Sequence, residues 1–165
     1  MLSKRAQPLV VVIGASAGGV DALDALLPHL AGAMAVIVVV HLPEGKPSLL
    51  VEIFSPRCKL AVKEVEDKEP LVPRSIYFAP PDYHVLIEKS LHLALSVDER
   101  VHHSRPSIDV LFQSAADALG AAVSGVLLTG ANADGAAGLA AIAHAGGTTI
   151  VQDPATAASP EMPSA

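Results

Sequence analysis

Cysteine, aromatic residues and charged residues are all scarce in this chain. Its single cysteine, Cys58, can form neither a disulfide within the chain nor a cysteine-rich zinc site, so a reducing compartment is expected. Charged residues make up 17% of the sequence, below the roughly 25% of average soluble domains, whereas hydrophobic residues make up 51%. This balance excludes intrinsic disorder.

A basic surface and a membrane-spanning run are also missing. Eleven Lys and Arg residues against seventeen Asp and Glu residues give a formal charge of −6, which excludes the broad basic face of a nucleic-acid-binding protein. The longest apolar run, residues 33–40, is far shorter than the about 20 residues that cross a bilayer. The first apolar run, residues 9–13, is too short for a signal peptide. We therefore expect a cytoplasmic protein that neither binds nucleic acid nor inserts into a membrane.

Short runs of β-branched residues alternate with stretches of helical spacing, a pattern typical of repeated strand–helix–strand units. The pattern predicts strands over residues 9–13, 35–40, 76–79, 123–129 and 148–152, and helices over residues 20–30, 48–55, 107–119 and 135–145. Residues 84–96 predict a hairpin, and the charged segment 63–69 predicts a solvated loop. The expected fold is a single α/β domain over residues 1–165: a doubly wound, mostly parallel sheet with helices on both faces and a β-hairpin insertion.

Three residues with catalytic chemistry follow predicted parallel strands. Ser16 lies in the turn Gly14-Ala-Ser-Ala-Gly18, which fits the G-x-S-x-G nucleophile elbow, although such a turn also binds phosphate or simply permits close packing. His41 ends the second strand, and Asp134 follows the strand over 123–129, where Asp is also a favoured helix cap. Because the carboxyl ends of parallel strands meet at one edge, these residues are expected together as a Ser-His-Asp triad.

The sequence gives less support for a dinucleotide-binding site or a metal site. The first turn does not fit the dinucleotide fingerprint G-x-G-x-x-G, because Ser16 replaces its second glycine and His41 stands where an acidic residue would hold a ribose. His84, His102 and His103 are expected in or near loops, where they line a pocket. Neighbouring residues such as His102 and His103 project differently, and no cysteine or carboxylate lies at ligand spacing, so we expect no metal and no cofactor.

Six segments, in this order, resemble the CheB family of protein-glutamate methylesterases from bacterial chemotaxis, and specifically its C-terminal catalytic domain. They are Ile13-Gly-Ala-Ser-Ala-Gly-Gly-Val20; Val40-His-Leu-Pro43; Tyr77-Phe-Ala-Pro-Pro81 followed by His84; Ser104-Arg-Pro-Ser-Ile-Asp109 with Leu111-Phe112; Leu128-Thr-Gly130 through Asp134-Gly135; and Gln152-Asp-Pro154 with Met162-Pro163. The resemblance covers nearly the whole chain. It implies that Ser16 is the nucleophile, His41 the general base and Asp134 the residue that orients the base.

The same resemblance implies an enzyme that removes methyl groups from glutamate methyl esters on the cytoplasmic helices of chemoreceptors, with glutamine deamidation in some members. Backbone N–H groups of Ala17 and Ala131 are expected to form the oxyanion hole. Arg105 is expected to pair either with acidic residues of a receptor helix or with an internal Asp. Two alternatives stay open: a small-molecule carboxylesterase with the same triad, and a non-catalytic nucleotide-binding or regulatory module.

The sequence departs from the family pattern in three places. Asn132 stands where members commonly carry Gly; Asn tolerates left-handed backbone geometry better than most residues, so we expect the loop to survive. The chain begins eight residues before its first predicted strand, so we expect no receiver domain ahead of the esterase domain. It stops just after Met162-Pro163, where the family continues with another helix and strand, so we expect a C-terminally short domain.

Overall fold

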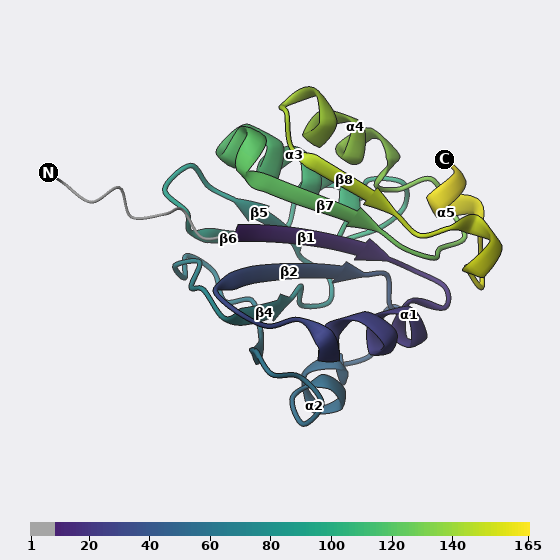
Figure 1. Ribbon diagram of the computed structural model, residues 1–165, viewed down its shortest axis with the longest axis horizontal. Helices are drawn as coiled ribbons and strands as arrows, with labels where there is room; N and C mark the ends of the chain where they lie inside the picture. Colours follow the sequence, from purple (N-terminus) through teal and green to yellow (C-terminus); the bar gives the residue numbers. More distant parts are fainter. Residues whose placement is uncertain (1–8) are drawn as a thin grey trace, which may run out of the picture.

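The computed structural model describes residues 9–165, and its centre is a six-stranded sheet with the order β3-β4-β2-β1-β7-β8 (Figure 1). Its strands are β1 (Leu9–Ala15), β2 (Met34–Val40), β3 (Ala61–Glu64), β4 (Ser75–Phe78), β7 (Val123–Leu127) and β8 (Thr148–Val151), and all neighbours pair in parallel. The helices are α1 (Gly19–Leu26), α2 (Leu50–Phe54), α3 (Ile108–Leu119), α4 (Ala136–His144) and α5 (Glu161–Ser164). Among the described residues, no helix has the length and apolar character needed to span a membrane.

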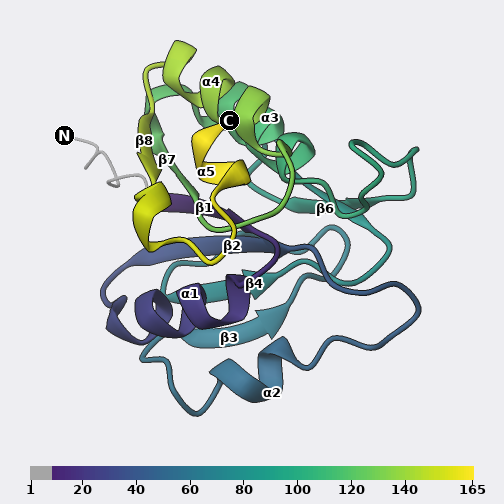
Figure 2. The ribbon, with the colours of Figure 1, turned by 90° about the vertical axis from the view of Figure 1, so that its right-hand side faces the viewer.

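Both faces of the sheet are buried, because successive side chains of a strand point to opposite faces. On β1, Val10 and Val12 belong to one buried cluster with residues of α3 and α4, whereas Ile13 and Ala15 belong to another with residues of α1 and α2. Figure 2 shows α1 and α2 on one side of the sheet and α3 and α4 on the other. The predicted doubly wound α/β fold is confirmed.

A β-hairpin lies outside the main sheet. Its strands, β5 (His84–Ile87) and β6 (Leu93–Ser96), pair antiparallel and confirm the predicted insertion. His84 begins β5, as the predicted hairpin requires, but the expectation that it lines a pocket is wrong, because it is 1% exposed. Its Nε2 donates to the carbonyl of Glu99 at 2.8 Å, and its Nδ1 accepts from the N–H of Ser107 at 3.1 Å. The buried His84 ring therefore holds both ends of the segment from residue 99 to residue 107.

The prediction that the charged segment 63–69 is a solvated loop is wrong for its first three residues. Residues 63 and 64 belong to β3, which pairs with β4 in the register Val62↔Ile76, and Val65 is buried. Charges are well tolerated here because β3 is an edge strand, where one row of backbone groups and part of the side chains face water. The pairing partner lies ten or more residues further along the chain, so local composition could not reveal the strand.

The C-terminal residues fold back over the end of β7. The N–H of Gly130 donates to the carbonyl of Ser159 at 3.0 Å, and the N–H of Met162 donates to the carbonyl of Gly130 at 2.9 Å. The side chain of Met162 is fully buried, and a Cβ on Gly130 would lie 2.6 Å from its sulfur. Glycine at position 130 thus lets the tail pack directly on the loop that leads to Asp134.

Candidate active site

Ser16 and His41 follow directly the ends of two neighbouring strands. The register pairs Ala15 of β1 with Val40 of β2, so the next residue on each strand emerges at the same edge, with the strands about 4.8 Å apart. The N–H of His41 donates to the carbonyl of Ala15 at 3.1 Å, and the N–H of Ser16 donates to the carbonyl of Thr129 at 2.9 Å. Three strands therefore hold the backbones of Ser16 and His41 in place.

The turn after Ser16 requires glycine. Gly18 has a φ of 79°, and a Cβ there would lie 2.7 Å from the Cβ of Ala158. The turn leads into the N-terminus of α1, and it leaves Ala17 exposed. Among residues 9–165, the N–H groups of Ala17 and Ala131 donate to no other backbone group, so both remain available to a ligand.

Asp134 is fully buried and accepts four hydrogen bonds. Its Oδ1 accepts from the Ser107 hydroxyl and the Asp109 N–H, both at 2.9 Å. Its Oδ2 accepts from the Ile108 N–H at 2.7 Å and from Nε2 of His41 at 2.8 Å. The carboxylate therefore caps α3 rather than its own helix α4, and it contacts His41 at the same time. Burial raises the pKa of Asp134, but the hydrogen bonds from His41 and from the backbone of Asp109 and Ile108 outweigh burial and hold that pKa below its ordinary value.

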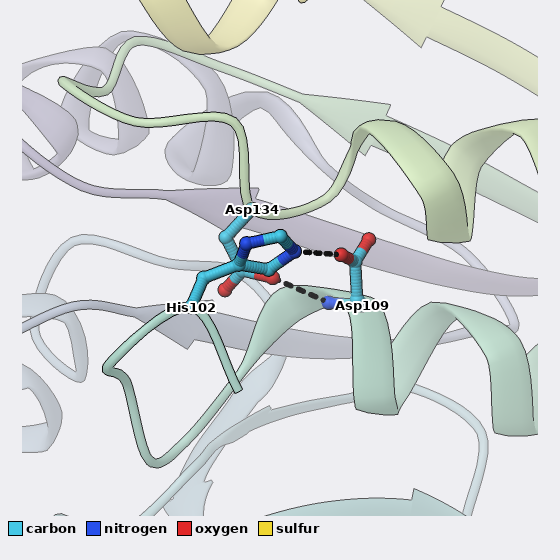
Figure 3. Close-up of side chains that lie close together, drawn as sticks. All are labelled: His102, Asp109 and Asp134. Atoms are coloured by element: carbon cyan, nitrogen blue, oxygen red, sulfur yellow. Dashed lines mark hydrogen bonds and ion pairs between the residues drawn. The ribbon is translucent and has the colours of Figure 1, made fainter. Parts of the chain in front are cut away.

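Asp109 is a buried residue that the sequence analysis did not select as a site residue. Its Oδ1 accepts from the N–H groups of Gly135 at 3.0 Å and Gly138 at 2.7 Å, which lie at the start of α4. Its Oδ2 contacts Nε2 of His102 at 2.9 Å (Figure 3). The two helices therefore cap each other: Asp134, just before α4, caps the N-terminus of α3, and Asp109, in the first turn of α3, caps the N-terminus of α4. Acidic residues are favoured in a first helical turn, which is the one signal that the sequence offered.

His102, Asp109 and Asp134 form a cluster whose potential ligand atoms lie within 4.8 Å of one another. Hydrogen bonding explains this cluster without a cation. Each of the four carboxylate oxygens already accepts at least one hydrogen bond from the protein, and most of these donors are backbone N–H groups at helix ends. A metal ion would have to displace these donors and uncap both helices.

The His41 ring is held on both of its nitrogens. Nε2 contacts Asp134, and Nδ1 lies 3.4 Å from the amide nitrogen of Asn132. The amide orientation follows from a second contact, because Asn132 Oδ1 accepts from the Asp134 N–H at 2.9 Å. An amide NH₂ group facing Nδ1 and a carboxylate facing Nε2 together favour the tautomer with its proton on Nε2 and its lone pair on Nδ1.

The three predicted triad residues are therefore brought to one edge of the sheet, but not all into contact. His41 and Asp134 are hydrogen-bonded, whereas within the described part of the chain the hydroxyl of Ser16 forms no hydrogen bond to His41 or to any other group. Ser16 is half-buried at the neighbouring strand end. Looser contacts of this kind are common in serine hydrolase sites without substrate.

A pocket of about 70 Å³ lies beside His41, with Pro43, Ala79, His103 and Arg105 among its lining residues. Nη1 of Arg105 donates to the carbonyls of residues 97 and 98 at 3.1 and 3.3 Å. Its Nε is buried without a partner among residues 9–165, and no ion pair within that range includes Arg105. The predicted alternative of an internal Asp partner is therefore wrong.

A doubly wound parallel sheet with Ser16, His41 and Asp134 beyond its carboxyl edge is an arrangement typical of α/β proteins with hydrolase activity. Within that class, residues 11–165 match the family model described as CheB methylesterase, and the chain belongs to this family. The resemblance drawn from the sequence motifs is confirmed.

Individual relatives agree with this assignment. A relative from Leptospira interrogans is 43% identical over 155 residues, which are 93% of this chain and 80% of the relative. The "Protein-glutamate methylesterase/protein-glutamine glutaminase" of Nitrosomonas europaea is 40% identical over 148 residues, which are 87% of this chain but 41% of that protein. The crystal structure of the Thermotoga maritima CheB methylesterase catalytic domain superposes with a TM-score of 0.91 at 31% identity, covering 96% of this chain and 86% of that one.

Proposed function

We propose that this protein hydrolyses methyl esters of glutamate side chains on chemoreceptors in the cytoplasm, and that the same site deamidates receptor glutamines. The observation that carries the proposal is the His41–Asp134 hydrogen bond at the sheet edge where Ser16 emerges from β1. Membership of the CheB methylesterase family and the name of the Nitrosomonas relative support the substrate class.

Ser16 is the proposed nucleophile and His41 the proposed base. As the Ser16 oxygen attacks the ester carbonyl, Nδ1 of His41 takes the hydroxyl proton and later returns it to the departing methoxide, which leaves as methanol. His41 then takes a proton from water as the water oxygen attacks the acyl-enzyme. The bond to Ser16 breaks, the Ser16 oxygen regains a proton from His41, and the receptor leaves with a free glutamate carboxylate. Asp134 keeps the Nε2 proton in place and stabilises the imidazolium. Asn132 has to release Nδ1 before this transfer, because its amide now lies 3.4 Å from that nitrogen.

The backbone N–H groups of Ala17 and Ala131 are the proposed donors to the oxyanion. Both residues are exposed, and both N–H groups lack a backbone acceptor in the part of the chain that the structure describes. The N-terminus of α1 adds a positive dipole end beside Ser16. Losing one such donor typically costs about 10² to 10³ in turnover. Alanine suits both positions because the main chain supplies the donors.

Arg105 is the proposed contact for an acidic side chain of the receptor helix. Its guanidinium has a buried Nε that no residue of the described range 9–165 contacts through a hydrogen bond, and it lines the pocket beside His41. We expect Arg105→Gln to raise KM for a methylated receptor peptide with neighbouring acidic residues by about tenfold, because a charge-assisted pair is lost. KM for a small uncharged ester should not change. An equal effect on both substrates would contradict the assignment.

Replacement of Ser16 tests the proposed function. We expect Ser16→Ala to lower methanol release from methylated receptor by about 10³-fold or more, since the nucleophile is gone. The fold should be retained, because the Ser16 hydroxyl forms no hydrogen bond among residues 9–165. Ser55→Ala, at an exposed serine after α2, is the matched control and should leave the rate unchanged.

Three outcomes would point elsewhere. Full activity of Ser16→Ala would refute the assignment of the nucleophile. Hydrolysis of p-nitrophenyl esters without any release of methanol from methylated receptor would indicate a small-molecule carboxylesterase. Saturable nucleotide binding without esterase activity would indicate a binding module built on the turn that contains Ser16.

A further inference from the structure

Asp109 is a second buried carboxylate directly behind the His41–Asp134 pair. Figure 3 shows its side chain near Asp134, with the ring of His102 hydrogen-bonded to it. Asp109 and Asp134 are 4% and 0% exposed. The proposed reaction uses only Asp134. Because burying a second carboxylate costs free energy, we expect Asp109 to have a function beside this pair.

Asp109 holds Asp134 from two directions. Its backbone N–H donates to Oδ1 of Asp134 at 2.9 Å, and its own Oδ1 accepts from the N–H of Gly135, the next residue in the chain, at 3.0 Å. The third contact, from the N–H of Gly138 at 2.7 Å, ties the carboxylate to the first turn of α4. Any side chain on Gly138 would press on this contact, because a Cβ there would lie 2.5 Å from Cβ of Phe112 and 3.1 Å from Oδ1 of Asp109.

The carboxylate of Asp109 lies close to that of Asp134, whose Oδ2 contacts His41. Ligand atoms of the two carboxylates and of His102 all lie within 4.8 Å of one another; both carboxylates are buried, whereas His102 is exposed. The titratable groups that face this end of α3 are Asp134 before α4, His102 from the turn over 101–104, and His84 from β5, which meets α3 at Ser107. On the pocket side of His41, the charged and titratable lining residues are Glu44, Asp82, Arg100, His103 and Arg105. Among these groups, Asp109 is the buried negative charge besides Asp134.

We propose that Asp109 is a positioning residue for the proposed esterase site: it fixes the loop of Asp134 through its backbone and side chain, and its charge adds to that of Asp134 in stabilising the protonated form of His41. The inference rests on the proposed function. A nearby negative charge favours an imidazolium, which is the state of His41 while the tetrahedral intermediate exists.

His102 gives experimental access to this charge. It lies in a tight turn in which the backbones of Val101 and Ser104 exchange two hydrogen bonds, and its side chain is 47% exposed while it contacts Asp109. The φ of His102 is 50°, a conformation that Asn tolerates and that Lys68 also adopts in this chain. Substitution of His102 by Lys therefore adds a positive charge beside Asp109 from the surface, without opening the core, whereas substitution by Asn changes the contact without adding a charge.

The test compares four variants of the full chain: Asp109→Asn, His102→Lys, His102→Asn and, as control, Asp117→Asn at an exposed position of the same helix α3. Two quantities are measured for each: the pH midpoint of the His41 ring titration by NMR, assigned with His41→Gln, and the acid limb of kcat/KM for methyl ester hydrolysis. The NMR midpoint needs no turnover. It therefore tests this inference even if the proposed function fails, and loss of hydrolysis in wild type would refute only the latter.

We expect Asp109→Asn to move both quantities to lower pH by about half a unit to one unit, because one negative charge near the imidazolium is removed. His102→Lys, which adds a permanent cation beside Asp109, should move them in the same direction and covers the case in which Asp109→Asn does not fold. His102→Asn keeps the negative charge and should not lower either midpoint, and Asp117→Asn should leave both unchanged.

Two results would overturn the proposal. The first is an unmoved His41 midpoint in a folded Asp109→Asn protein and in His102→Lys. The second is an equal fall in all three variants of Asp109 and His102, which would mean that the contact between these residues matters only for shape.

Discussion

Replacement of Asp134 by asparagine (Asp134→Asn) tests the central electrostatic feature of the site. The carboxylate accepts four hydrogen bonds, two on each oxygen. The amide that replaces the carboxylate in this variant has one oxygen, which can accept from two of these four donors. Its NH₂ group faces the other two donors and cannot accept from them. With the nitrogen at the Oδ2 position, the N–H of Ile108 loses its acceptor, and the His41 proton has to move from Nε2 to Nδ1. With the nitrogen at the Oδ1 position, the Ser107 hydroxyl can turn to accept, but the N–H of Asp109 is left unpaired.

Either orientation leaves one buried backbone N–H group without a partner, which costs about 1 to 3 kcal/mol, and removes a charge from the N-terminus of α3, which costs about 0.3 to 1 kcal/mol more. We therefore expect the free energy of unfolding at pH 7 to fall by about 1 to 4 kcal/mol. Turnover should fall by about 10³- to 10⁴-fold, because the variant stabilises the imidazolium less and permits the wrong tautomer.

The stability difference should depend on pH. The pKa of Asp134 in the folded protein lies below its ordinary value of about 3.9, so the carboxylate contributes stability that is present above that value and lost as pH falls through the folded pKa. Urea denaturation at pH 7 and again below pH 4 measures this directly. Asp117→Asn serves as the exposed control. A stability at pH 7 within about 0.5 kcal/mol of wild type, or a difference that grows on acidification, would refute this account of the capping carboxylate.

Two further predictions concern the residues around the loop that precedes Asp134. Asn132→Asp keeps the acceptor for the Asp134 N–H but places a carboxylate oxygen against Nδ1 of His41. Because this negative charge favours the imidazolium, the acid limb of the pH–rate profile should move to higher pH by about one unit or more. An unmoved limb would mean that the 3.4 Å contact does not persist in solution. Met162→Ala empties a fully buried site against Gly130 and should lower the free energy of unfolding by about 2 to 5 kcal/mol, measured by urea denaturation, whereas a loss below about 1 kcal/mol would show that the tail contributes little.

Some of the structure could be predicted because it depends on local pattern. The continuous apolar runs of β1 and β2 follow from strands that are covered on both faces, and the small residues around Ser16 follow from a sharp turn with a φ of 79° at Gly18. The place of the site could also be predicted, because parallel strands of one sheet present their carboxyl ends at the same edge.

Other features involve partners that local pattern does not identify. Lys63 and Glu64 have the composition of a loop, yet they belong to a strand because β4 supplies its hydrogen bonds. His84 begins the predicted hairpin, yet its burial could not be predicted, because the partners of its ring, Glu99 and Ser107, reach it only in the folded chain. In both cases the deciding partner is a residue or strand that folding brings close.

The sequence by itself determined the doubly wound class, the elbow that presents Ser16, the strand end that carries His41, and the loop after β7 that carries Asp134. Only the tertiary structure decided that Asp134 caps α3 while it contacts His41, 93 residues away, and that Asp109 caps α4 in return. The physical reason is that buried carboxylates need several donors, and a helix end offers them in one place. Which helix end meets which carboxylate depends on how α3 and α4 pack against each other, and no local spacing in the chain encodes that contact.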